Sequence, residues 1–216
     1  MSTVAYRELT RRTKLAKSSE LCLPRSAKTP PSGLAWIHET KHDGFRILAR
    51  KDGNRVKLIT RNGCDFADRY PLIVDAIASL PVRTCIIDGE AIVVDQNGLA
   101  TFDLLRYCQH DHAATLCAFD VLDLDGADLR PSPIEERKQH LAWALRGQHH
   151  GIAINATYNG DGGVIYQHAC TLGCEGIVSN RLGSPYRAGR TDQWLKMKNP
   201  HAPAVRRERE IDWAKR

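Results

Sequence analysis

The chain has 216 residues, of which 42% are hydrophobic and 26% charged, and these proportions are ordinary for a soluble globular protein. No apolar run approaches the roughly 20 residues that a membrane-spanning helix needs, and no apolar segment follows the basic N-terminus as it would in a secretory signal, so we expect a cytoplasmic protein with no membrane partner. The net charge of +6 favours an anionic partner, of which nucleic acid is the commonest.

The cysteines do not indicate disulfides or zinc. There are seven of them, at irregular spacings and without a Cys-x-x-Cys pair, so neither a disulfide framework nor a zinc site is predicted. The nearest approach to a metal cluster is Cys108, His110 and His112, which we interpret as a chance grouping in a loop.

Residues 1–33 are basic, rich in Ser and Pro and without periodicity, which is typical of an arm or linker. From Trp36 onward the pattern is mainly that of β-strands separated by turns that contain glycine. We expect hairpin turns at His42–Gly44 and Asp52–Asn54, and a further turn at Asp95–Gly98. The expected strands are 35–41, 45–50, 55–61, 85–94 and 116–124, and one helix is expected over 69–80.

In the second half, Ser132, Pro133 and Glu135 have the form of a helix start, with Ser132 as the cap and Glu135 completing a capping box. This helix is expected to run to Arg146. We also expect a helix over 163–173. The remaining expected strands are 151–158, 175–180 and 193–198.

The sequence thus predicts three parts. They are an arm (1–33), an α+β domain of antiparallel sheets flanked by helices (34–200), and a charged tail (201–216).

Two expected strands carry charge on one face. Alternation along 35–41 places Glu39 and Lys41 together, directly before the Asp43–Gly44 turn. Strand 193–198 has Trp194, Lys196 and Lys198 on one face and Leu195 and Met197 on the other. Two lysines on one face repel each other unless an anion lies between them. Solvated charges on an edge strand are the alternative, and Lys41 taken alone reads as a surface charge.

Glu90 and Glu175 each lie in an apolar strand beside a glycine. A carboxylate there is costly to bury unless it meets a cation, a metal or a hydroxyl, and glycine permits close approach of a ligand or of backbone. An exposed acid at a strand end is the alternative for each. Phe119 by itself is expected in the core.

The order of the motifs is more specific than any one of them. K-x-D-G-x-R is followed by T-R-N-G, D-G-E, F-D-V-L, E-G-I-V and W-L-K-M-K. This order resembles the nucleotidyltransferase domain of ATP-dependent DNA ligases, and most of all the ligase module of bacterial end-joining repair proteins and their short stand-alone relatives. The resemblance covers about residues 30–216. It implies the ATP-grasp-like fold of that superfamily.

By this resemblance, Lys41 attacks the α-phosphate of ATP, expels pyrophosphate and holds AMP as a phosphoramidate. The attack needs an uncharged amine. We expect the nearby cations Arg46, Lys196 and Lys198 to disfavour the protonated form of Lys41 and to stabilise charge on the phosphate.

The resemblance also implies roles for the other site residues. Phe119 would stack on the base and Glu39 would lie beside the adenine. Glu90 would bind a ribose hydroxyl or the metal, and Glu175 the metal or the surroundings of the lysine. The metal is expected to be Mg²⁺, or Mn²⁺. The implied ATP/AMP site consists of Glu39, Thr40, Lys41, Arg46, Arg61, Glu90, Phe119, Glu175, Lys196 and Lys198.

In the later steps AMP would move to a 5′-phosphate at a DNA nick, and a 3′-hydroxyl would displace it. The implied partners are nicked or broken double-stranded DNA and end-joining repair proteins, in association with the nucleoid. The basic arm would hold phosphates without sequence preference, unless it is only a solubilising tail. The arm residues in question are Arg7, Arg11, Arg12, Lys14 and Lys17.

Two features depart from the family pattern. Asn180 stands where the strand that begins with Glu175 usually ends in lysine, which removes a cation expected to face phosphate. Only 18 residues follow Lys198, whereas a folded domain needs at least about 50. We therefore expect no OB-fold domain, so that closure over the substrates comes from DNA, from a partner, or not at all.

Three functions are compatible with these residues. The leading one is an ATP-dependent DNA ligase adenylation domain that serves strand sealing in DNA repair and recombination. The second is a non-catalytic module that binds nicks or nucleotides. The third is an RNA ligase or a capping guanylyltransferase, which the flanking sequence TRNGCDFADRYP disfavours.

Overall fold

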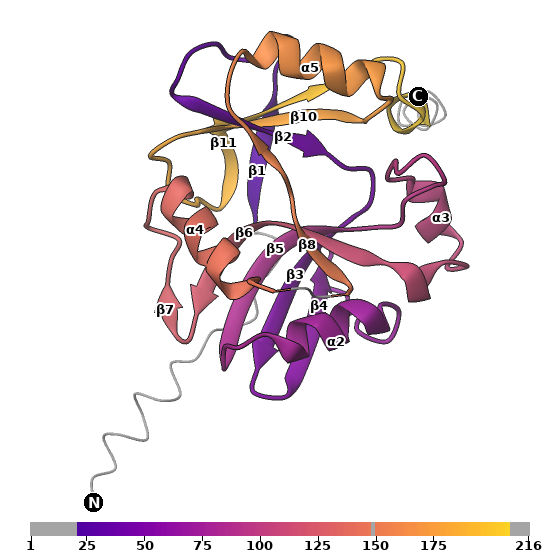
Figure 1. Ribbon diagram of the computed structural model, residues 1–216, viewed down its shortest axis with the longest axis vertical. Coiled ribbons are helices and arrows are strands. Elements are labelled where there is room, and N and C mark those ends of the chain that lie inside the picture. Colours follow the sequence, from indigo (N-terminus) through magenta and orange to yellow (C-terminus); the bar gives the residue numbers. More distant parts are fainter. Residues whose placement is uncertain (1–20, 148–149, 208–216) are drawn as a thin grey trace, which may run out of the picture.

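The computed structural model describes residues 21–147 and 150–207. In this part of the chain two β-sheets face each other, with helices on their outer sides (Figure 1). One sheet has five strands in the order β1-β11-β10-β2-β9, and the other has six, in the order β4-β3-β5-β6-β7 with β8 paired to β6. The strands are β1 (Cys22–Ser26), β2 (Trp36–Lys41), β3 (Phe45–Asp52), β4 (Arg55–Thr60), β5 (Thr84–Ile92), β6 (Thr115–Leu124), β7 (Ala127–Asp128), β8 (Ile152–Ile154), β9 (Thr157–Tyr158), β10 (Gly176–Arg181) and β11 (Gly189–Lys198).

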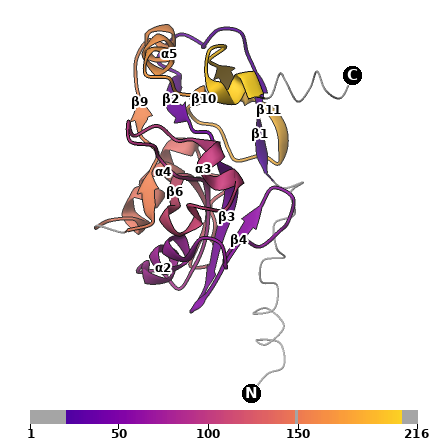
Figure 2. The same ribbon diagram turned by 90° about the vertical axis from the view of Figure 1, so that its right-hand side faces the viewer.

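Helices lie on the outer faces of the two sheets and along the sides of this arrangement (Figure 1). They are α2 (Pro71–Ser79), α3 (Phe102–Arg106), the 3₁₀ helix η2 (Asp111–Ala113), α4 (Ile134–Ala144) and α5 (Gly162–Thr171). Helix α5 lies over the five-stranded sheet and α2 lies at the opposite end of the molecule, under the six-stranded sheet (Figure 2). None of the helices in the described ranges is long and apolar enough to cross a membrane.

Alternation along the strands divides the apolar side chains between separate cores. In β3, Ile47 and Ala49 join the core between the six-stranded sheet and α2, whereas Leu48 points to the other sheet. There it meets Ile37 of β2 and Trp194 of β11, so the space between the sheets is apolar at one end. A third, small core lies under α5. The expected α+β class is confirmed.

The sheets are mixed, which differs from the antiparallel sheets that the sequence predicts. Strand β1 runs parallel to β11, and β8 runs parallel to β6. Both exceptions come from short segments whose partners are distant in the chain, and a local pattern does not specify such a partner.

The expected hairpin at His42–Gly44 is wrong. Strand β2 pairs with β10 and β9 in one sheet, whereas β3 pairs with β4 and β5 in the other, so residues 42–44 cross between the sheets. The expected hairpin between β3 and β4 is confirmed. The last residue of β2 therefore stands where the chain leaves one sheet for the other.

Two expected boundaries also differ. The sequence predicts an arm up to residue 33, yet β1 is part of the five-stranded sheet and Leu21 and Cys22 are buried in the core between the sheets. Likewise Ala202 and Val205, in the expected tail, are buried. The basic residues Arg7, Arg11, Arg12, Lys14 and Lys17 lie outside the described residues.

Some local predictions fail for physical reasons. Ser132 does not cap α4, because Pro133 occupies the cap position and Glu135 instead accepts hydrogen bonds from the amide of Gly183. The expected strand 151–158 is broken at Asn155 into β8 and β9, which belong to different sheets. Helix α3 follows the turn at Asp95–Gly98, in a segment for which the sequence predicted no helix.

Candidate functional site

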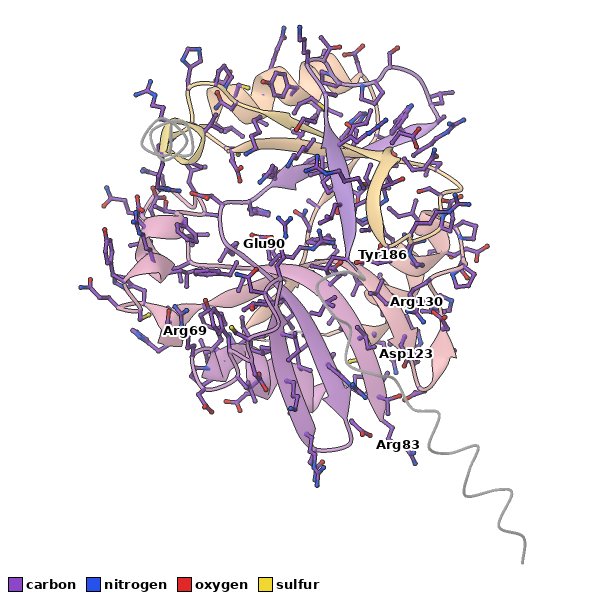
Figure 3. The ribbon with its side chains drawn as sticks, turned by 180° about the vertical axis from the view of Figure 1, so that it is seen from behind. Arg69, Arg83, Glu90, Asp123, Arg130 and Tyr186 are labelled. Atoms are coloured by element: carbon purple, nitrogen blue, oxygen red, sulfur yellow. The ribbon has the colours of Figure 1, made fainter. Side chains whose placement is uncertain are left out.

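A cavity of about 250 Å³ lies between the two sheets, and we refer to it as the intersheet cavity. Figure 3 shows Glu90 where the upper and lower sheets meet. Eight of the ten residues expected at the ATP site line this cavity, namely Glu39, Thr40, Lys41, Arg46, Arg61, Glu90, Phe119 and Lys196. The other two, Glu175 and Lys198, form ion pairs beside it. The structure thus brings together all ten residues from distant parts of the chain.

Lys41 is held at the crossing between the sheets. It is the last residue of β2, and its Cα is paired with that of Gly176 in β10. After it the chain turns sharply past β5, where a Cβ added to Gly44 would lie only 2.2 Å from the carbonyl oxygen of Ala91. Any side chain at position 44 would push the crossing away from β5, so Gly44 fixes the place of Lys41.

The ammonium group of Lys41 is paired with a buried carboxylate. Its Nζ lies 2.5 Å from Oε2 of Glu175, and the two side chains are 22% and 5% exposed. Lys198 Nζ lies 3.8 Å from the other oxygen of Glu175. The residue after Glu175 is a glycine because the backbone of β11 passes close to it. A Cβ added to Gly176 would lie only 2.0 Å from the carbonyl oxygen of Met197.

The charge state of Lys41 differs from the prediction. Burial by itself lowers the pKa of the Lys41 ammonium, but the negative charges of Glu175 and Glu90 outweigh burial, so its pKa is raised above the ordinary value. The expectation that nearby cations favour the neutral amine is therefore wrong for the nucleotide-free protein. In this state Lys41 is an ammonium ion and not a nucleophile.

Glu90 is a half-buried carboxyl group on β5 that faces the same cavity. Burial raises the pKa of Glu90 to about 7, although the positive charges of Lys41 and Arg46 act in the opposite direction. The alternative of an exposed strand-end acid is excluded for Glu90 and for Glu175. A carboxyl group that titrates near neutral pH inside a cavity is typical of a functional site.

Glu39 is held by two partners on its two oxygens. Lys138 of α4 donates to Oε1 at 2.7 Å, and Asn180 of β10 donates to Oε2 at 2.5 Å. Lys138 also donates to the carbonyl oxygen of Phe119, at 3.0 Å. A cation from α4 therefore lies beside Asn180, close to the position at which the family pattern has a strand lysine.

Arg46 ties the two sheets together at the cavity wall. Its Nε and Nη2 donate to the two oxygens of Asp88, at 3.0 and 2.7 Å, and its Nη1 donates to the carbonyl oxygen of Cys22, at 2.7 Å. The hydroxyl of Tyr186, labelled in Figure 3, also donates to Asp88, at 2.7 Å. Since Cys22 belongs to β1 and Arg46 to β3, this network joins the five-stranded sheet to the six-stranded one.

The remaining lining includes aromatic and cationic side chains. Phe119 is partly exposed to the cavity, with the Arg46 guanidinium 5.3 Å from its ring centre and the Trp194 ring centre at 6.3 Å. Arg61 and Arg190, both exposed, line the cavity together with Lys196. Such cations suit an anionic ligand. Phosphate groups in particular are commonly bound by arginine, whose guanidinium group can donate two parallel hydrogen bonds to them.

A divalent ion at the cavity would take its protein oxygen donors from the carboxylates of Glu90 and Glu175. Within residues 21–147 and 150–207, no group of three His, Cys, Asp or Glu residues is arranged to hold a metal. Mg²⁺ is commonly bound by one or two carboxylates together with substrate phosphates. Two carboxylates beside a cationic cavity therefore fit Mg²⁺ that arrives with a nucleotide, and do not form a complete metal site by themselves.

Sequence reasoning missed five polar residues of the site: His42, Asp88, Lys138, Asn155 and Arg190. Asp88 stands in the D-G-E motif, so the sequence does give a local signal for it. Lys138 and Asn155 give no local signal, because their partners lie on distant strands. Asn155 donates to the carbonyl oxygen of Thr40, at 3.1 Å, and its Oδ1 lies 3.0 Å from Nε2 of His42, so it buttresses the segment that carries Lys41.

The model of the ATP dependent DNA ligase domain matches residues 15–198 of the chain. The chain belongs to this family. Its similarity to the multifunctional non-homologous end joining protein LigD of Pseudomonas aeruginosa is 35% identity over 173 residues, which is 78% of this chain and 20% of that protein. Its similarity to the SPbeta prophage-derived DNA ligase-like protein LigB of Bacillus subtilis is 31% identity over 182 residues, or 82% of this chain and 66% of the relative.

Among solved structures, the chain is similar to a mycobacterial DNA ligase D complexed with ATP and MES, at a TM-score of 0.72 and 26% identity, over 85% of this chain and 62% of that one. The relatives are named DNA ligases or end-joining proteins, and this chain is a ligase domain of the LigD type. It spans about a fifth of the length of the LigD relatives that it matches.

Proposed function

We propose that this ligase domain uses ATP to adenylate Lys41 and passes the AMP to the 5′-phosphate of a DNA nick, so that the strand can be sealed. The observation that carries the proposal is the position of Lys41 at the crossing between the sheets, in a cavity whose lining includes the aromatic ring of Phe119 and the cations Arg61, Arg190 and Lys196. A nucleoside triphosphate has the matching character, with an aromatic base and an anionic chain.

In the proposed first step, the Lys41 amine attacks the α-phosphorus of ATP. A P–N bond forms, the P–O bond to the β-phosphate breaks, and pyrophosphate leaves with the electron pair of that bond. Lys196 and Lys198 of β11 would stabilise the charge that builds on the phosphate oxygens. Arg46 would hold the cavity wall in place through Asp88 and Cys22.

The amine must lose its proton first, and the charges around it decide how easily. Glu175 and Glu90 favour the ammonium form while both carboxylates are free. A ligand that engages these two carboxylates removes the charges that raise the pKa of Lys41, while Lys198 and burial continue to favour the neutral amine.

A divalent ion, when bound, would polarise the phosphate oxygens and favour the departure of pyrophosphate. Glu90 and Glu175 are the residues that would hold it. The later steps, in which AMP moves to a 5′-phosphate and a 3′-hydroxyl closes the strand, would act on nicked or broken double-stranded DNA, with end-joining proteins as possible recruiters. Association with the nucleoid and phosphate contacts of the N-terminal arm stay predictions.

The test uses ATP labelled in the α-phosphate, with Mg²⁺ or Mn²⁺. We expect the label on the wild-type chain, none on Lys41→Ala, and transfer from the charged protein to a nicked duplex that is then sealed. The control is Lys57→Ala, because Lys57 is an exposed lysine on the outer strand β4. A wild-type chain that stays unlabelled with both metals contradicts the proposal.

The second candidate is a module that binds nicks or nucleotides without catalysis, and Asn180 in place of lysine is the observation that favours it. It predicts DNA or nucleotide binding with no labelled lysine. An Asn180→Lys variant that gains labelling which the wild type lacks would support this candidate.

A further inference from the structure

Two polar atoms next to the cavity have no partner. Five side-chain polar atoms in the described part of the chain are buried without a hydrogen bond, and two of them, Oδ1 of Asn180 and Nε1 of Trp194, belong to residues that line the intersheet cavity. The two residues are direct partners across β10 and β11, so their side chains lie on the same face of the sheet. Unpaired buried polar atoms are rare in native proteins and require an explanation.

The orientation of the Asn180 amide is determined by its neighbours. Glu39 accepts a hydrogen bond from Lys138 at Oε1 and another from Asn180 at Oε2. Both oxygens therefore act as hydrogen-bond acceptors, as they do in an ionised carboxylate. The amide nitrogen of Asn180 must therefore face Glu39, and the oxygen is the atom left over. Trp194 has a single polar atom, an N–H that only donates. The β10–β11 pair thus carries one unpaired acceptor and one unpaired donor on the same face of the sheet.

We infer that Asn180 and Trp194 select the base of the nucleotide by its hydrogen-bonding edge. The inference rests on the proposed function, because it assigns the base to this end of the cavity. The 6-amino group of adenine would donate to Asn180 Oδ1, and the ring nitrogen next to that group would accept from Trp194 Nε1. Guanine carries a carbonyl oxygen at position 6, which would oppose the Asn180 oxygen. Asn180 is thus a specificity residue for adenine over guanine.

The surroundings agree with this assignment. The Asn180 and Trp194 side chains are 1% and 3% exposed, so an unpaired atom on either is kept from water. Phe119, whose ring contacts Trp194 edge to face, supplies an apolar surface beside them. A buried site that pairs with a substrate N–H discriminates strongly against an analogue without it, because the site's own polar atom is then left unpaired.

The experiment measures equilibrium binding by titration calorimetry without divalent ions, so that no chemistry follows. The probes are ATP and the triphosphate of purine riboside, which lacks the 6-amino group and keeps the ring nitrogens. We expect the wild type to bind ATP about 10-fold or more tightly than the analogue. Asn180→Lys keeps a donor toward Glu39 but has no acceptor, so it should bind the two nucleotides within about 2-fold of each other.

Two further variants separate selection from packing. Trp194→Phe keeps the ring but loses the N–H, so it should weaken both nucleotides alike and retain the preference for ATP. Asn97→Lys makes the same exchange in an exposed turn and should bind as the wild type does. If Asn180→Lys fails to fold, the wild-type preference for ATP and its survival in Trp194→Phe carry the test.

Equal binding of the two nucleotides by the wild type, or no binding of either, overturns the inference. So does an Asn180→Lys variant that is folded and as selective as the wild type. Selective binding without any label on Lys41 supports the inference and contradicts the proposed function, so the two failures are distinguishable.

Discussion

Replacing Glu90 by glutamine is expected to stabilise the nucleotide-free protein at neutral and alkaline pH. The pKa of Glu90 is raised from the ordinary 4.5 to about 7 in the folded protein, chiefly by burial. Between these two values the folded state binds more protons than the unfolded state, so this group makes stability fall as the pH rises. Below pH 4.5 the group is neutral in both states and has no such effect.

The size of the effect follows from the two pKa values. A difference of about 2.5 between 4.5 and about 7, at about 1.4 kcal/mol for each pKa unit, gives an effect on the order of 3 kcal/mol above pH 7. Glu90→Gln removes the titrating group. The variant should therefore match the wild type near pH 4.5 and exceed its unfolding free energy by about 2–3 kcal/mol near pH 8.

The assay is urea unfolding of both proteins over this pH range, without nucleotide or divalent ions. The control is Glu136→Gln, since Glu136 is an exposed acid on α4 and its charge is expected to change stability by no more than about 0.5 kcal/mol. A Glu90→Gln advantage that is the same at all pH values, or a wild type that is the more stable at pH 8, would refute the reasoning. A carboxyl group that destabilises the fold in this way is typical of a site kept for function.

Three further predictions follow from other contacts. Glu175→Gln removes a charge that raises the pKa of Lys41, so the pH midpoint of Lys41 modification by an amine reagent should move to lower pH. The control is Asp103→Asn, which removes the acid of an exposed ion pair. An unchanged midpoint in Glu175→Gln, or an equal change in the control, would contradict the pairing of Lys41 with Glu175. Asp120→Asn leaves the fully buried Arg137 without its counter-charge and should destabilise the protein by about 3–5 kcal/mol. Asp128→Asn, in the exposed pair with Arg130, should lose no more than about 1 kcal/mol, and equal losses in the two urea titrations would be inconsistent with this account. Replacing the arm residues by serine should reduce the slope of log affinity for nicked DNA against log salt by up to about 4, and an unchanged slope would mean that the arm does not contact phosphate. The residues replaced are Arg7, Arg11, Arg12, Lys14 and Lys17.

The sequence predicted the faces of the strands well, because alternation is a local property. Glu39 and Lys41 share the cavity face of β2, and Trp194 and Lys196 share that of β11. Met197, on the other face, is buried under α5. The motif order then brought these strands into one hypothesis, although no single motif was specific enough to do so.

What the sequence could not supply is which segments meet. An Asp-Gly turn looks the same whether the chain returns to the same sheet or crosses to another, so the crossing after Lys41 was missed. Lys138 looks like any polar helix residue, and it reaches Glu39 only because α4 is fixed on β6 through the Arg137–Asp120 pair. For the same reason the predicted direction of the Lys41 pKa shift was wrong. The cations can be recognised in the motifs, but the short distance between Lys41 and Glu175 cannot.

The central claim, that Lys41 is the residue that accepts AMP, is tested most directly by mass spectrometry of the protein after incubation with ATP and Mg²⁺. We predict one added AMP per chain, located by peptide mapping on Lys41 and absent from Lys41→Ala. The linkage should be labile in acid, as expected for a phosphoramidate. AMP on another residue, or a wild-type protein that binds ATP and remains unmodified with both Mg²⁺ and Mn²⁺, would contradict the account.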